Sequence, residues 1–90
     1  MYIQFSEYYL TDNNELCPAN VVDDLESCKE SVVQLKNTLP NAIFEDTEIT
    51  SEWPKGCYLV GNMVYFNEHA TGSSHSSARH ICEVQGKLLI

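Results

Sequence analysis

The chain has 90 residues, and its 13 acidic side chains against five basic ones give a formal net charge of −8. This length predicts one domain covering the whole chain, 1–90, without a second core. So acidic a surface is repelled by phosphate backbones and anionic lipid, which argues against nucleic acid and bare membranes as partners. A cationic partner or a neutral glycan remains compatible with it, and so does a charge that only keeps the protein soluble. No apolar run approaches the roughly 18 residues of a membrane span.

The first half of the chain predicts a strand, a helix and a short strand. Residues 3–10 are rich in strand-forming side chains. Residues 21–36 carry apolar side chains at steps of four and three, which is typical of one helix face. These side chains are Val21, Leu25, Cys28, Val32 and Leu35. Asn20 is expected to cap the helix and Asn37 to end it in a left-handed conformation. Residues 42–49 predict the short strand.

The second half contains the clearest local pattern, two apolar runs on either side of Gly61-Asn62. This predicts a tight β-hairpin, and the two-residue turn fixes its register. The expected pairs are Val60 with Met63, Leu59 with Val64, Tyr58 with Tyr65 and Cys57 with Phe66. Residues 67–80 predict a long polar loop and residues 81–84 a last strand. Gln85-Gly86 then predicts a turn into an apolar tail.

Four widely spaced cysteines, Cys17, Cys28, Cys57 and Cys82, predict a disulfide framework. Two cross-links of about 2–4 kcal/mol each would contribute much of the stability of so small a domain, and they indicate an oxidising compartment such as the outside of the cell. A zinc site would need short Cys-x₂₋₄-Cys steps, which are absent, so no metal is expected.

The pairing follows from the faces of the helix and the hairpin. Cys28 lies in the apolar stripe of the helix, and Cys57 shares a hairpin face with Leu59, Val64 and Phe66. A helix packed on that face brings Cys28 and Cys57 together and leaves Cys17 for Cys82. The predicted fold is therefore α+β, with one helix packed on a small antiparallel sheet and two disulfides.

The start of the chain bears on the compartment. It has no basic segment and no small-residue cleavage site, so no signal peptide is visible. This conflicts with secretion, and three explanations of the conflict are open: a mature form behind an added Met, a fragment of a longer secreted protein, or a reducing compartment with four free thiols.

The other hairpin face carries Tyr58, Val60, Met63 and Tyr65, which are the predicted ligand-binding residues. Exposed aromatic side chains suit glycan stacking or a protein contact. The alternative is that the first strand, the segment around Trp53 or the apolar tail covers this face.

Three histidines, His69, His75 and His80, lie in or beside the polar loop and could bind a metal or act as bases. Their spacing matches no ligand motif, and the nearby serines lie in no Gly-x-Ser-x-Gly elbow. We expect no catalytic residue and no cofactor.

The order of Cys28, Gly56-Cys57-Tyr58 and Cys82 resembles a PAN/apple-type domain over residues 17–82. The resemblance implies a helix cross-linked to the hairpin, an end-to-end bridge, and protein or carbohydrate binding without catalytic residues. The chain lacks the family's further cysteine near the helix.

The expected function is a non-catalytic extracellular binding or adhesion module for a protein or glycan. One alternative is a small structural subunit of a larger assembly in an oxidising compartment such as a thylakoid lumen. A second alternative is a small hydrolase or metal-dependent enzyme built on the three histidines.

Overall fold

The computed structural model describes residues 1–89, except for the side chains of 4, 5 and 85–88. In chain order its elements are β1 (Tyr2–Leu10), α1 (Leu25–Leu35), β2 (Ile43–Glu48), β3 (Pro54–Val60), β4 (Met63–Gly72) and β5 (Arg79–Leu89). The strands form one sheet in the order β1-β5-β3-β4-β2. The predicted α+β fold is confirmed.

The sheet is antiparallel except at one edge, where β2 runs parallel to β4. The hairpin of β3 and β4 has the predicted register, from Val60 opposite Met63 to Cys57 opposite Phe66. No pattern in the sequence predicts this parallel pair, because the partner of β2 is set by contacts distant in the chain.

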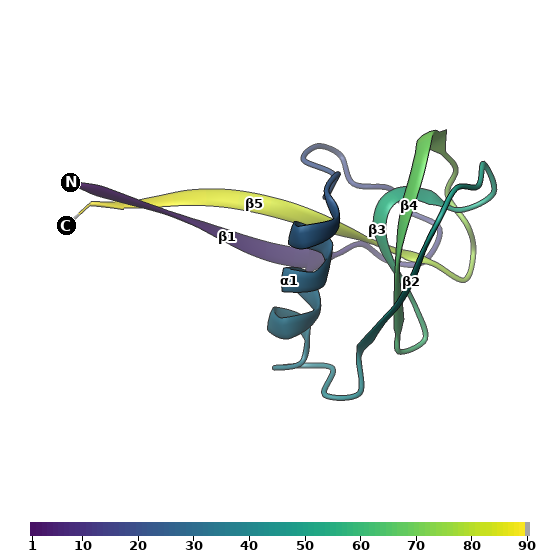
Figure 1. The fold of residues 1–90 in the computed structure, drawn as a ribbon, viewed down its shortest axis with the longest axis horizontal. Helices are drawn as coiled ribbons and strands as arrows, with labels where there is room; N and C mark the ends of the chain where they lie inside the picture. Colours follow the sequence, from purple (N-terminus) through teal and green to yellow (C-terminus); the bar gives the residue numbers. More distant parts are fainter. Residues whose placement is uncertain (90) are drawn as a thin grey trace.

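Strands β1 and β5 form a long two-stranded ribbon that extends away from the rest of the molecule (Figure 1). They pair from Leu10 opposite Ile81 to Tyr2 opposite Leu89 at the tip of the ribbon. The predicted turn at Gln85-Gly86 is therefore wrong, because both residues continue β5 opposite Ser6 and Phe5. The tail up to Leu89 pairs with β1 instead of covering the hairpin, and Ile90 lies outside the described residues.

The core lies between α1 and one face of the sheet. From the helix it contains Cys28, Val32 and Leu35, and from the sheet the side chains that were predicted to face the helix. These are Cys57, Leu59, Val64 and Phe66. The hydrophobic effect thus places the predicted helix stripe on the predicted hairpin face.

The helix begins later than predicted. Its N-cap is Asp24, whose side chain accepts a hydrogen bond of 2.8 Å from the Ser27 amide, and not Asn20. Asn20 has a positive φ of 55°, and Val21 forms an isolated bridge to Cys82 in β5. The Asn20 carbonyl also accepts a hydrogen bond from Glu83 N in β5, and the Val22 carbonyl accepts one from Cys57 N in β3. These contacts hold residues 20–22 against the sheet, so the helix does not begin at Val21.

The end of the helix and the polar loop also differ from expectation. The C-cap is Lys36 in a right-handed conformation, and Asn37 is not among the described residues with positive φ. The loop predicted over residues 67–80 is only 73–78, because β4 continues to Gly72 and β5 begins at Arg79. Polar side chains are tolerated in these strand segments because one side of the sheet faces solvent.

Both predicted disulfides, Cys17–Cys82 and Cys28–Cys57, are confirmed, with Cα–Cα distances of 5.7 and 5.4 Å. They join the segment before the helix to β5, and the helix to β3. Paired cysteines of this kind indicate an oxidising compartment. The helix found within residues 1–89 is too short to cross a membrane.

Candidate functional site

Four aromatic rings form a stacked row on the sheet face opposite α1. In order they are His75, Trp53, Tyr58 and Tyr65, and we call this set the aromatic row. The His75 and Trp53 centroids are 3.7 Å apart, while the two later steps are 5.5 Å each, with interplanar angles of 9° and 20°. Tyr58 and Tyr65 stack because they are directly opposed in the hairpin register.

The Trp53 ring is positioned by a buried asparagine. The Asn67 side-chain amide donates to the carbonyls of Thr50, Trp53 and Pro54, at 2.8, 3.1 and 3.1 Å. Its oxygen accepts from the amides of Thr50 and His69. Asn67 is only 1% exposed, so one side chain fixes the loop between β2 and β3 from the inside.

Beside the row lies a shallow hollow of about 250 Å³, which we call the outer hollow. It is lined by Glu48, Trp53, Tyr58, Val60 and Tyr65. Three of the four predicted ligand-binding residues therefore meet there, and the fourth, Met63, adjoins it through its sulfur, which accepts a hydrogen bond from the Tyr65 hydroxyl at 3.5 Å.

The four predicted residues differ in how much of each side chain is exposed to a ligand. Tyr58 is 1% exposed because Trp53 and Tyr65 cover its two ring faces. Val60 and Tyr65 are half-buried, and Met63 is exposed. The segment around Trp53 thus covers part of the face, as one alternative expected, and leaves the end at Tyr65 open.

Sequence reasoning missed Glu48 as a member of this site. The Tyr58 hydroxyl donates a hydrogen bond to a Glu48 carboxylate oxygen. Burial, and secondly the negative charge of Asp46, raise the pKa of Glu48. No local motif could have revealed this, because Glu48 reaches the site only through the parallel pairing of β2 with β4.

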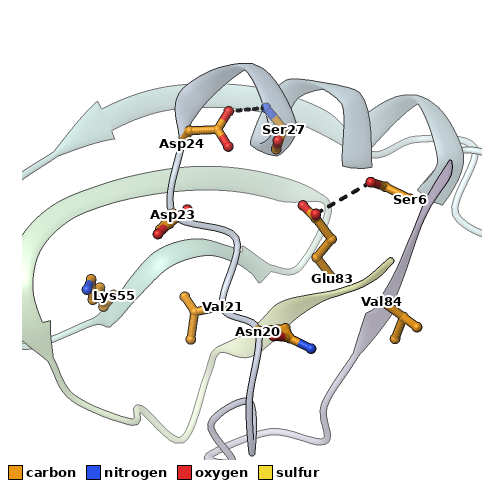
Figure 2. Close-up of a pocket in the computed structure, with 9 residues that line it drawn as sticks. All are labelled: Ser6, Asn20, Val21, Asp23, Asp24, Ser27, Lys55, Glu83 and Val84. Carbon is orange, nitrogen blue, oxygen red and sulfur yellow. Dashed lines mark hydrogen bonds between the residues drawn. The ribbon is translucent and has the colours of Figure 1, made fainter. Parts of the chain in front are cut away.

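A larger hollow of about 600 Å³ lies on the helix side of the molecule, between the N-terminus of α1 and the base of the ribbon (Figure 2). Asp23, Asp24 and Glu83 border it together with Lys55. Asp24 caps the helix there, and the Ser6 hydroxyl donates to Glu83 at 3.4 Å. This acidic hollow was not predicted, because its residues come from four separate segments.

The three histidines have structural contacts and do not converge. His80 is 2% exposed, and its Nδ1 accepts from the Cys17 amide while Nε2 lies 2.6 Å from the Lys55 carbonyl. His69 Nδ1 accepts from Gly72 N, and His75 Nδ1 accepts from Ser77 N. Among the described residues, no three His, Cys, Asp or Glu side chains are grouped so that they could hold a metal ion.

Comparison with known proteins gives no relative: no family model, curated protein or solved structure matches the chain.

Proposed function

We propose that the chain is a non-catalytic extracellular recognition module that binds a protein or a glycan through the outer hollow. The observation that supports this most is the aromatic row, whose open end at Tyr65 lies on the β3–β4 hairpin next to a hollow. Aromatic side chains held in place by packing make good binding anchors, because little conformational entropy is lost when a ligand covers them.

The disulfides support the same proposal in two ways. Small disulfide-dense domains are most common among secreted proteins, which favours an extracellular site. The bridges Cys28–Cys57 and Cys17–Cys82 also agree with what the likeness to PAN/apple-type domains implies, and such domains bind proteins or carbohydrates. Membership of that family is part of the proposal.

The second candidate is a structural subunit of a larger assembly in an oxidising compartment such as a thylakoid lumen. The ribbon favours it, because Tyr2 and Leu89 are opposed at its tip and are 67% and 65% exposed. Strand β1 also forms an edge of the sheet, where another chain could add a strand.

One set of variants separates the two candidates. Oxidised wild-type protein, Tyr65→Ala and the double variant Tyr2→Lys/Leu89→Lys are compared on a glycan array and in pull-downs from secreted material. Binding that is lost with Tyr65→Ala but kept by the ribbon variant supports the recognition module. Binding lost only with the ribbon variant contradicts it in favour of the structural subunit.

A further inference from the structure

We infer, building on the proposed function, that the outer hollow receives the guanidinium group of an arginine presented by a protein partner. The hollow combines an aromatic ring with an open end, a carboxylate oriented by a hydroxyl, and a second carboxylate nearby. This combination matches a planar cation better than it matches a neutral ligand.

The stacking part of the site is Tyr65. Its ring follows Tyr58 at 5.5 Å in the row, and it is half-buried and lines the hollow. Tyr58 occupies one side of Tyr65, and the row has no further ring beyond it among those described. A guanidinium is flat and weakly hydrated, so it stacks on an aromatic ring at a smaller desolvation cost than an ammonium.

The charged part of the site is Glu48, with Asp46 beside it. The Tyr58 hydroxyl donates to one oxygen of the Glu48 carboxylate and so orients that carboxylate toward the hollow's aromatic wall. Asp46 is the register partner of Tyr65 on the edge strand β2, and its side chain is exposed.

Among the side chains that the structure describes, none supplies a positive charge that lowers the pKa of Glu48. Burial and Asp46 both act against its negative form, and no basic side chain of the described residues is among the groups that shift its pKa. A guanidinium would supply the missing positive charge together with N–H donors that match a carboxylate.

The net charge of the whole chain also favours a positively charged partner. At −8, it attracts a basic partner over distances longer than the contact itself. A sugar would stack on Tyr65 but would leave the charges of Glu48 and Asp46 without a counter-charge. A metal ion prefers several oxygen ligands, and no group of three His, Cys, Asp or Glu side chains lies here among the described residues.

The direct test uses the peptide acetyl-Gly-Arg-Gly-amide and its citrulline analogue, which has the same shape without the charge. Trp53 is the single tryptophan of the chain, so its fluorescence reports on the aromatic row. We expect the arginine peptide to bind with a dissociation constant on the order of 1 mM, and the citrulline peptide at least about tenfold more weakly. Binding should weaken as the salt concentration rises.

Matched variants locate the site. Glu48→Gln should weaken arginine binding about tenfold, whereas Glu15→Gln removes the same charge from an exposed position outside the hollow and should leave binding nearly unchanged. Tyr65→Phe should keep the affinity and Tyr65→Ala should lose it. Melting temperatures establish that each variant is folded.

The outcomes distinguish this inference from the proposed function. Equal binding of the two peptides, no binding of either, or equal effects of Glu48→Gln and Glu15→Gln overturns the arginine site. A glycan or a protein without a required arginine, bound in a manner that depends on Tyr65, overturns it while the proposed function stands. If no array, pull-down or peptide measurement shows dependence on Tyr65, both fail.

Discussion

The side-chain amide of Asn67 donates a 3.1 Å hydrogen bond to the backbone carbonyl of Trp53, and so joins β4 to the loop that carries a ring of the aromatic row. Each of the two residues makes further hydrogen bonds. Ser73 N also donates to the Trp53 carbonyl, at 2.9 Å, and Asn67 holds Thr50 and Pro54 as well. The position of the Trp53 ring in the aromatic row therefore depends on a residue that is itself buried.

Replacing Asn67 should test this dependence. Asn67→Ala removes three donated and two accepted hydrogen bonds in a buried place, so we expect the free energy of unfolding to fall by about 2–3 kcal/mol. The Trp53 fluorescence spectrum should also shift in the folded state. Asn13→Ala, at an exposed position, is the control and should change neither quantity. A stable variant with an unchanged spectrum would contradict the role of Asn67.

The two disulfides should differ in how readily they are reduced. Cys28 and Cys57 are both 0% exposed, whereas Cys17 is half-buried. A thiolate must reach a sulfur atom to exchange with it, so Cys17–Cys82 should be reduced first in the native protein. Peptide mapping after brief treatment with a reductant measures this order. In denaturant, where burial is absent, the two rates should become similar.

The contacts of His80 indicate that the folded state becomes less stable as the pH falls. Its Nδ1 accepts a hydrogen bond from the Cys17 amide at 2.9 Å, and Nε2–H donates to the Lys55 carbonyl, so the ring must be neutral. Burial lowers the pKa of His80, and the bond to Lys55 opposes this only in part. The unfolded chain then binds a proton more readily than the folded one, and the stability present above the ordinary pKa of 6.5 is lost as the pH falls toward the lower folded pKa.

Urea unfolding between about pH 7.5 and 5.5 measures this loss, in a range above the titration of most carboxylates. In His80→Gln the protein should be less stable at pH 7.5 and should lose part of its pH dependence. His69→Gln serves as the control for removal of a histidine outside the core. A stability of the wild type that is constant over this range would contradict the prediction.

Two glycines with positive φ provide a matched pair. At Gly56 an added Cβ would lie 2.2 Å from the Val22 carbonyl oxygen, whereas at Gly61 it would meet nothing within 4 Å. Both substitutions by Ala incur the left-handed backbone cost of about 1–2 kcal/mol, and only Gly56→Ala adds the clash. We expect Gly61→Ala to fold with a modest decrease in melting temperature and Gly56→Ala to lose several times more stability. Similar melting temperatures for the two variants would mean that the segment around Val22 adapts.

The sequence predicted the elements that depend on neighbouring residues. The register of the hairpin follows from a two-residue turn. The pairing of Cys28 with Cys57 follows from the apolar faces of one helix and one hairpin. The predictions that were wrong concern segments whose structure depends on contacts distant in the chain. Val21 has the spacing of the helix stripe, but its bridge to Cys82 in β5 and the hydrogen bond from Cys57 N in β3 to the Val22 carbonyl hold this segment against the sheet.

The candidate site was predicted in part for the same reason. Tyr58 and Tyr65 are cross-strand neighbours, so their shared face could be predicted from the hairpin alone. Glu48 reaches the hollow through parallel pairing of β2 with β4, and Trp53 through the hydrogen bonds of Asn67. Neither contact leaves a periodic pattern in the sequence.

The two tyrosines of the face should separate stability from binding. The face pattern alone suggests that Tyr58→Ala and Tyr65→Ala both weaken binding at a nearly constant melting temperature. The structure changes this expectation for Tyr58, which is 1% exposed between Trp53 and Tyr65. Truncating so buried an aromatic ring typically costs about 3–5 kcal/mol, so Tyr58→Ala should destabilise the protein strongly.

Tyr65→Ala should have the opposite profile. Tyr65 is half-buried at the end of the row, so its truncation should cost less stability than that of Tyr58 and should remove binding. Thermal unfolding and a titration with the bound partner give a melting temperature and an affinity for each of the two variants.

His75→Ala tests the other end of the row. It uncovers one face of Trp53, whose ring centroid lies 3.7 Å from that of His75, and should leave binding at Tyr65 nearly unchanged. If His75→Ala abolishes binding while Tyr65→Ala does not, the ligand lies at the His75 end of the row, and the outer hollow is not the binding site.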